Sequence, residues 1–323
     1  MRLFLTLFIM CLTLSVSAQT ANDVAVKYNE AAALVREKKF TEAIPVLQEA
    51  ATMGIAVGPE ALQTVQQAQK LLPVCTFQKA VSQAKTGNLD GALATLKTAS
   101  ELGELYGDLS TMNKCKAMTS KIYTMKAAKA FNAKDYATAA EIFAQGYEAN
   151  KLDTSIGLNL AMSYCELGAA GNAEAKAKGF EVYQAIMALE KRHSRYKEPA
   201  ATAKEKMVYY LMLDAGEAAK ANNANGVYTA TDKVLALDAT NATAKMLRLQ
   251  TATNKKDWNK VIAEGESAAA AQTTPELKSE AYFLLGAAYQ NKEDKAKAIA
   301  IYQKVTAGAK VETAKSQIAL LSK

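Results

Sequence analysis

The 323-residue chain carries 39 basic and 32 acidic residues, a formal net charge of +7 at pH 7, and is 50% hydrophobic and 7% aromatic. Its basic residues are spread along the sequence, and the interleaving of aromatic and basic residues that nucleic-acid binders use is absent. We therefore expect no nucleic-acid partner. The length is compatible with one elongated domain or two globular ones.

The first eighteen residues have the features of a secretory signal peptide. Arg2 precedes an apolar run from Leu3 to Val16, and small residues stand one and three places before Gln19. The run is too short to span about 30 Å of hydrocarbon, so a removed signal is favoured over an anchor. We predict cleavage after Ala18. The mature chain, residues 19–323, is then exported without a transmembrane segment to the periplasm, with secretion as the alternative.

After the signal peptide the sequence reads as nearly all helix, because alanine recurs at helical spacing and alternating β-branched runs are missing. A pattern of small and large apolar residues also recurs, once at a separation of 34 residues, which is the length of a helix-turn-helix repeat. The clearest copy is C-terminal and contains Tyr282, Leu285, Gly286, Tyr289, Ala298, Ile299 and Tyr302. Over roughly residues 24–323 the pattern resembles the tetratricopeptide repeat (TPR) family, in an exported bacterial member.

This resemblance implies an all-α fold, a right-handed α-solenoid of about seven helix-turn-helix repeats. The small residue at which the first helix of each pair approaches the second is assigned to Ala31, Ala80, Ala127, Ala161, Ala215, Leu249 and Gly286. Its partner on the second helix is assigned to Ala43, Ala92, Ala139, Ala173, Val227, Val261 and Ala298. A bulky residue precedes the second helix in four copies, as Phe40, Leu89, Tyr136 and Trp258, but Ala170, Ala224 and Lys295 replace it in the others.

Uneven spacing between the copies predicts elongated first helices. We expect one uninterrupted helix near 107–133, about 40 Å long at 1.5 Å per residue, and an equivalent stretch at 59–86 that kinks or breaks at Leu72-Pro73. Val311, Ala314, Ile318 and Leu321 form the apolar stripe of a C-terminal capping helix. We divide the mature chain into N-terminal repeats with elongated helices, 19–198, and C-terminal repeats with the cap, 199–323.

Three cysteines remain in the mature chain, Cys75, Cys115 and Cys165. An odd number cannot form a complete disulfide framework, and no Cys-x-x-Cys pair or histidine cluster is present to hold zinc. We interpret them as small buried side chains. A bridge between Cys75 and Cys115 stays open as an alternative in an oxidising compartment. No metal site is predicted.

The only histidine, His193, lies in a basic run from Lys191 to Lys197. This run would suit phosphate, an acidic partner or anionic lipid, but we favour a solvated connection between helices because no aromatic platform or glycine cradle accompanies it. Nucleophile-elbow, zinc-protease and phosphate-loop motifs are absent from the sequence. We therefore predict no catalytic residue, no cofactor and no enzymatic activity.

In the TPR family the first helices line the concave face, and the residue three places before the small registered residue usually points into it. These positions are mostly apolar here, and the Lys and Asn pattern that clamps a C-terminal carboxylate in some family members is absent. The alternative is that the side chains pack between neighbouring first helices. The predicted partner-binding residues are Tyr28, Phe77, Leu158, Met212, Met246 and Phe283, with Thr124 at the same position of the third copy.

The resemblance implies an interaction scaffold or adaptor of the cell envelope, which binds a peptide segment or a folded partner protein on its concave face and associates with envelope complexes. The alternative is an outer-membrane-associated glycan-binding protein built on similar helices. The chain departs from that class because it lacks a lipidated cysteine and paired tryptophans. Trp258 is the only tryptophan, and its place in the repeat predicts a packing role.

Overall fold

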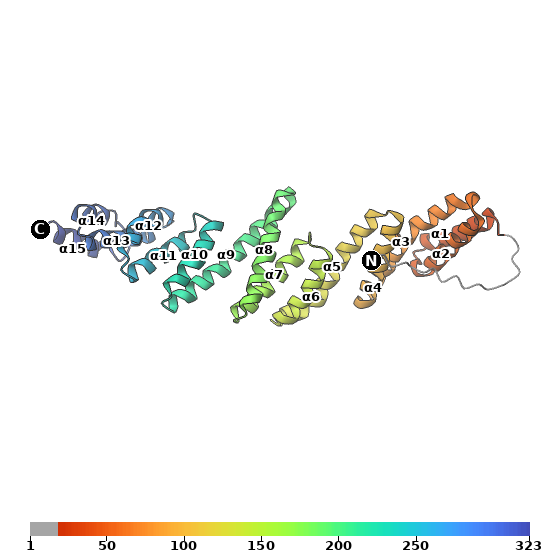
Figure 1. Ribbon diagram of the computed structural model, residues 1–323, viewed down its shortest axis with the longest axis horizontal. Helices are drawn as coiled ribbons and strands as arrows, with labels where there is room; N and C mark the ends of the chain where they lie inside the picture. Colours follow the sequence, from red (N-terminus) through yellow and green to blue (C-terminus); the bar gives the residue numbers. More distant parts are fainter. Residues whose placement is uncertain (1–18) are drawn as a thin grey trace. The chain divides into compact units, whose positions relative to one another are not determined.

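The computed structural model describes residues 19–323, which contain fifteen α-helices, three short 3-10 turns and no strand (Figure 1). The all-α prediction is confirmed for this part of the chain. The predicted signal peptide, residues 1–18, lies outside the described residues.

The helices follow one another as seven pairs and a final single helix, as the sequence predicted. The pairs are α1 (Ala21–Arg36) with α2 (Phe40–Val57), α3 (Leu62–Lys85) with α4 (Leu89–Tyr106), α5 (Leu109–Asn132) with α6 (Tyr136–Ala149), α7 (Thr154–Ala169) with α8 (Ala173–Ala188), α9 (Lys197–Lys220) with α10 (Ala224–Leu237), α11 (Ala242–Asn254) with α12 (Trp258–Ala271), and α13 (Pro275–Asn291) with α14 (Lys295–Tyr302). Helix α15 (Val311–Leu321) ends the chain, and the 3-10 turns are Pro59–Ala61, Leu189–Lys191 and Ser194–Tyr196.

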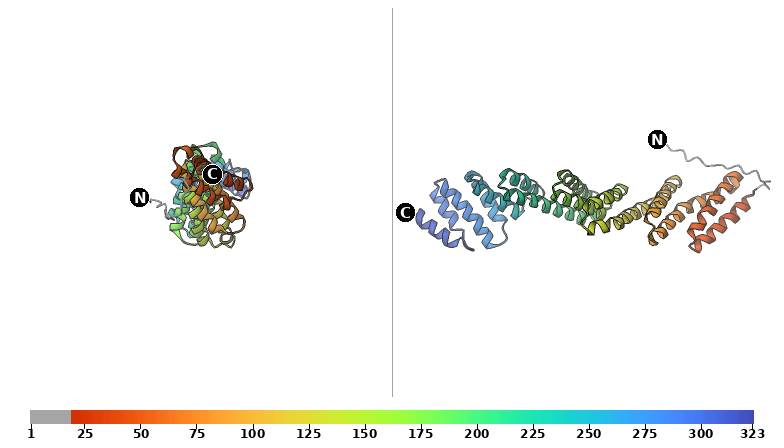
Figure 2. Two further views of the ribbon diagram at one scale, coloured as in Figure 1. Left: turned by 90° about the vertical axis from the view of Figure 1, so that its right-hand side faces the viewer. Right: turned by 90° about the horizontal axis from the view of Figure 1, so that it is seen from below.

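The described residues form two compact units, one ending at Leu167 and the other beginning at Gly168. Within the first unit α1 to α4 pack in sequence, and α3 also contacts α1 and α5. Within the second unit α9 packs on α10 and α12 on α13, while α11 also contacts α13. The blue C-terminal helices lie side by side in Figure 2, where α14 packs on both α13 and α15. Contacts from each helix to the next, and from first helix to first helix, are typical of helical repeats.

The turn inside each pair has one conformation throughout. The residue two places before the second helix has a positive φ, and these residues are Lys38, Gly87, Lys134, Gly171, Asn222, Lys256 and Glu293. In six pairs the next residue is an Asn or Asp whose side-chain oxygen accepts a hydrogen bond from a backbone N–H in the first turn of the second helix: Asn88, Asp135, Asn172, Asn223, Asp257 and Asp294. Such N-caps fix where a helix begins.

This turn corrects the predicted frame of the fourth pair. Helix α7 continues through Gly168 to Ala169, so the turn and the start of α8 fall three residues later than predicted. Ala173, predicted at the helix crossing, is exposed and is the first residue of α8; the bulky position therefore belongs to Ala173 and not to Ala170. By the same register Tyr164 replaces Ala161 on the first helix, and Lys176 stands where the other pairs have Ala or Val.

Three first helices are elongated to the same extent. Helices α3, α5 and α9 each have 24 residues. The uninterrupted helix predicted near 107–133 is confirmed as α5. A kink or a break was predicted at Leu72-Pro73, and the break is wrong, because α3 runs through Pro73.

Helix α3 is buried around the proline. Pro73 and its neighbour Leu72 are both buried, and the Thr76 hydroxyl donates a hydrogen bond of 2.8 Å to the Leu72 carbonyl. Packing of α3 against α2 and α4 therefore offsets the ~3 kcal/mol that a proline costs inside a helix.

The predicted C-terminal helix is confirmed as α15. Ala314 is buried against Ala298, Tyr302 and Val305, and Val311, Ile318 and Leu321 pack on the same cluster. The preceding connection is fixed by the Ser279 hydroxyl, whose oxygen accepts hydrogen bonds from the backbone N–H groups of Thr306 at 3.1 Å and Ala307 at 3.0 Å.

Candidate functional site

The structure brings together only two of the predicted partner-binding residues in one open hollow. Tyr28 and Phe77 are half-buried and pack against core clusters of the first unit. Leu158 on α7 is half-buried, and in the corrected frame the equivalent position, three residues before Tyr164, belongs to the fully buried Ala161. Phe283 stacks against Tyr302, with ring centroids 5.6 Å apart, and packs on the α14–α15 cluster. The remaining two residues, Met212 on α9 and Met246 on α11, line the same hollow, which is the first candidate site.

We call this site the α9–α11 hollow. It has a volume of about 570 Å³ and is lined by Tyr209, Met212, Leu213, Gly216, Thr243, Met246, Leu247, Gln250, Gln272 and Leu277. None of these side chains carries a formal charge. The volume lies within the range of pockets that hold small ligands or side chains of a partner.

One face of α9 builds the hollow through residues at helical spacing, Tyr209, Met212, Leu213 and Gly216. Tyr209 is 55% exposed and Leu213 42% exposed, so large apolar surface meets solvent at the rim. A Cβ added at Gly216 would meet no atom within 4 Å, so this glycine leaves open space. Met246 is only 7% exposed and belongs to the core cluster of α11–α13. The hollow thus has a half-buried methionine, Met212, in its α9 wall and a buried one, Met246, in its α11 floor.

Two side-chain amides at the border of the α9–α11 hollow are hydrogen-bonded to neighbouring helices. The Gln272 side-chain amide donates to the carbonyls of Ala242 at 3.1 Å and Ala268 at 3.0 Å, which ties the end of α12 to the start of α11. The Gln250 amide donates to Glu280 at 3.1 Å. These two amides hold helices together, and most of the remaining lining of the hollow is apolar.

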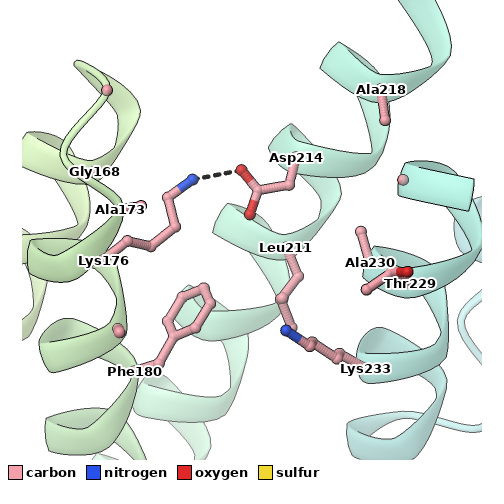
Figure 3. Close-up of a pocket in the computed structure, with 13 residues that line it drawn as sticks. Gly168, Ala173, Lys176, Phe180, Leu211, Asp214, Ala218, Thr229, Ala230 and Lys233 are labelled. Atoms are coloured by element: carbon pink, nitrogen blue, oxygen red, sulfur yellow. Dashed lines mark hydrogen bonds and ion pairs between the residues drawn. The ribbon is translucent and has the colours of Figure 1, made fainter. Parts of the chain in front are cut away.

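The opposite face of α9 lines a second hollow, which we call the α8–α10 hollow (Figure 3). It has a volume of about 500 Å³. Leu211, Asp214 and Ala218 face it from α9, while Lys176 and Phe180 come from α8. Lys176 forms an ion pair with Asp214 across the hollow. Sequence reasoning missed this site because it placed the start of α8 three residues too early.

Three pairs lack a bulky residue at this position, and two of them, the fourth and the fifth, have a hollow beside it. In other pairs that residue is packed: Phe40, Leu89 and Trp258 contact core clusters, and the ring of Tyr136 lies 5.8 Å from that of Phe131. Ala173 instead lines the α8–α10 hollow, and Ala224 lines a smaller hollow of about 180 Å³ at the neighbouring turns. Replacement of a large side chain by Ala leaves space that the fixed helices do not close.

A polar network joins α10, α11 and α12 close to these sites. Arg248, 13% exposed at its side chain, pairs with Glu264 at 2.8 Å and with Asp232. Its guanidinium carbon lies 5.1 Å from the ring centroid of Tyr228, and the Lys260 ammonium lies 3.6 Å from the same centroid. Two cations and two carboxylates balance one another here, so the network holds helices together and presents no spare charge.

Two buried thiols of the described residues have raised pKa values. Burial raises the pKa of the Cys75 and Cys115 thiols to about 11, so both stay protonated near neutral pH; they are not bridged. No group of three or more His, Cys, Asp or Glu residues within 19–323 is arranged to hold a metal ion. Among these same residues, no helix has the length and apolar character needed to cross a membrane.

The basic run around His193 forms the connection between α8 and α9. His193 is exposed, and its Nδ1 accepts a hydrogen bond of 3.1 Å from the Arg195 backbone N–H. Tyr196 is buried, and the Arg195 guanidinium stacks 4.6 Å from its ring centroid. The run is thus ordered by local contacts that hold a loop in place.

No protein-family model matches the chain, and no curated protein matches it. Solved TPR structures are similar to it. The TPR2AB domain of yeast Sti1, solved in complex with pHSP90, covers 94% of this chain and 99% of its own at 14% identity, with a TM-score of 0.33. The P58(IPK) TPR domain covers 93% and 97% at 12% identity, with a TM-score of 0.32. A tetratricopeptide repeat protein from Parabacteroides merdae covers 93% and 99% at 12% identity, with a TM-score of 0.28. At these identities and TM-scores the likeness assigns no ligand or partner to this chain.

Proposed function

We propose that this protein is an exported scaffold or adaptor of the cell envelope, and that it binds an apolar segment of a partner protein in the α9–α11 hollow. The observation that carries the proposal is the uncharged lining of the hollow together with its exposed rim of Tyr209, Leu213 and Leu277. Contiguous exposed apolar patches on a protein surface mark interaction sites.

The partner segment that fits best has spaced apolar anchors, in an extended or helical conformation. About 570 Å³ accommodates a few large side chains. Met212 is half-buried and can change rotamer, so the wall can adapt to anchors of different shape. The lysine excess of the chain favours acidic residues beside those anchors.

A glycan-binding function is the alternative, and the packing of Trp258 argues against it. This tryptophan is partly buried and packs on the core cluster of α11–α13, as the repeat pattern predicted. Tyr209 is then the aromatic residue at the rim of the α9–α11 hollow on which a sugar would stack. A protein segment uses the aliphatic rim residues as well, so we favour it.

Export is tested by expressing the chain with its own first eighteen residues in a bacterium and measuring intact mass. We expect residues 19–323 in the periplasmic fraction, with Gln19 at the N-terminus. A full-length cytosolic product, or a mass increased by a lipid, would contradict the proposed location.

Binding is tested with a displayed library of peptides that carry spaced apolar anchors, selected on residues 19–323. We expect selected peptides to lose binding to Leu213→Asp and to keep binding to Leu105→Asp, because Leu105 is equally apolar and 66% exposed but lies on α4. Equal loss in the two variants, or no loss in either, would refute a groove at α9–α11.

A further inference from the structure

The α8–α10 hollow exists because small residues surround the unfilled position at Ala173. Its border contains Gly168, Gly171, Ala177 and Gly226 beside that alanine. Phe180 is half-buried and its ring points from α8 toward α9 (Figure 3), while Leu211, which is only 2% exposed, closes the bottom of the hollow. The result is an apolar floor beneath an open hollow of about 500 Å³.

Lys176 puts a charge where the other pairs bury a small apolar residue. The equivalent residues Ala43, Ala92, Ala139, Val227, Val261 and Ala298 are at most 1% exposed. A Cβ at Gly168 would lie 2.4 Å from the Cβ of Lys176, so only glycine leaves room for this side chain. The ammonium, on a side chain that is 19% exposed, pairs with Asp214. Lys176 is therefore held in one direction, with its charge neutralised.

Lys233 supplies a second ammonium to the same hollow. Its side chain extends from α10 toward Leu211 (Figure 3). Within residues 19–323 the lysine has no carboxylate partner, whereas Lys176 and Asp214 cancel one another. Two ammonium groups and one carboxylate leave the hollow with one unmatched positive charge above an apolar floor. Thr229, which is exposed on α10, lines the same hollow.

We propose that the α8–α10 hollow binds a small organic monoanion with an apolar body, such as an aryl- or alkyl-carboxylate. The apolar body packs on Phe180 and the alanines around it, and the anion meets Lys233. One charge is favoured over two, because Asp214 repels a second anionic group and already occupies Lys176. This ligand is independent of the protein segment proposed for the α9–α11 hollow, since the two sites lie on different faces of α9.

The test uses residues 19–323 with 4-phenylbutyrate as probe and 4-phenylbutanamide as its uncharged match, followed by calorimetry and ligand-observed NMR. We expect saturable binding of the acid. The amide should bind roughly 5-fold more weakly, because it lacks the one partly exposed ion pair that the carboxylate forms with Lys233. Lys233→Gln should erase the difference. Lys129→Gln, an exposed lysine on α5 of the other unit, should preserve it.

Two further variants test the hollow from opposite directions. Ala173→Trp introduces the residue that the sixth pair carries at this position and should abolish binding with an unchanged or raised melting temperature. Asp214→Asn frees Lys176 and should tighten binding of the acid several-fold. Equal affinity for acid and amide, weaker binding to Asp214→Asn, or no saturable binding of the acid up to roughly 10 mM would overturn the proposal. Leu213→Asp, which alters only the α9–α11 hollow, should leave the affinity for 4-phenylbutyrate unchanged.

Discussion

The guanidinium of Arg248 on α11 donates two hydrogen bonds to the carboxylate of Glu264 on α12, from Nη2 at 2.8 Å and from Nε at 3.2 Å. Its remaining nitrogen, Nη1, donates to Asp232 and, at 3.3 Å, to Thr231, both on α10. One side chain thus spans three successive helices of the second unit. Charge-assisted pairs with two parallel hydrogen bonds fix geometry as well as contributing energy.

Arg248→Met should lower the free energy of unfolding by about 1–3 kcal/mol, because Glu264 then loses both donors in a partly buried place. Thermal and urea unfolding measure this loss. Arg36→Met is the control, since Arg36 is exposed on α1 and donates only to a backbone carbonyl. A loss in Arg248→Met no larger than in this control would mean that the network does not join the helices.

Gly286→Ala should destabilise the protein by about 1–3 kcal/mol, because the new Cβ would lie 2.7 Å from the Tyr302 ring and force apart two packed helices. Gly216→Ala is the matched control inside another helix. No atom lies within 4 Å of its new Cβ, so the higher helix propensity of Ala should stabilise it by up to ~1 kcal/mol. Opposite signs of the two changes in melting temperature are expected; the same sign would contradict the close approach at Gly286.

The variants Met246→Glu and Met212→Glu should lower the stability of the protein to different extents, because Met246 lies in the core and Met212 borders the open hollow. Met246 packs with Leu249 and Val261, so a carboxylate there should cost about 3 kcal/mol or more. Met212 is half-buried at the open hollow, and its substitution should cost less than ~1 kcal/mol while abolishing peptide binding. Equal destabilisation by the two variants would place Met212 in the core and remove it from the proposed groove.

Deletion of residues 311–323 should expose the apolar cluster of Ala298, Tyr302 and Val305 that α15 covers. We expect self-association in light scattering with the helical circular dichroism of the remaining chain retained, since repeats are stabilised mainly by their neighbours. A truncated chain that stays monomeric and unfolds at the parental temperature would show that α15 is not a cap.

Alkaline pH should destabilise the folded protein through its buried acids. Burial raises the pKa of Cys75 and Cys115 from 9.0 to about 11 and that of Tyr302 from 10.0 to about 12. The folded state therefore holds these protons more tightly than the unfolded chain, and the stability they give is complete below pH 9 and is lost as pH rises toward 11 and 12.

The denaturation midpoint measured from pH 8 to 11 should fall accordingly. Cys75→Ala combined with Cys115→Ala should flatten the decline between pH 9 and 11. Iodoacetamide should label both thiols only under unfolding conditions. An unchanged midpoint, or labelling of the native protein, would contradict the burial of these thiols.

The number of helix pairs and the elongated α5 were readable from the sequence, because both are local properties. Small residues at each helix crossing recur with the repeat, as Ala31 and Ala43 do in the first pair. The turn was readable too: in the fourth pair Gly171-Asn172 supplies the positive φ and the N-cap of α8. The predicted frame of the fourth pair was instead set by the 34-residue separation between Ala127 and Ala161. A frame based on Gly171 and Asn172 puts Lys176 at the helix crossing, as the structure does.

Tertiary packing decided what remained. Pro73 opposes a helix locally, yet α3 continues because burial between α2 and α4 outweighs the missing hydrogen bond. Equivalent sequence positions also received different environments, since Met212 borders an open hollow whereas Met246 sits in the core. The sequence by itself determined the pairs, their turns and the capping helix, because each depends on neighbours a few residues away. Only the packed structure decided where a missing side chain leaves a hollow, because that space depends on how closely distant helices can approach.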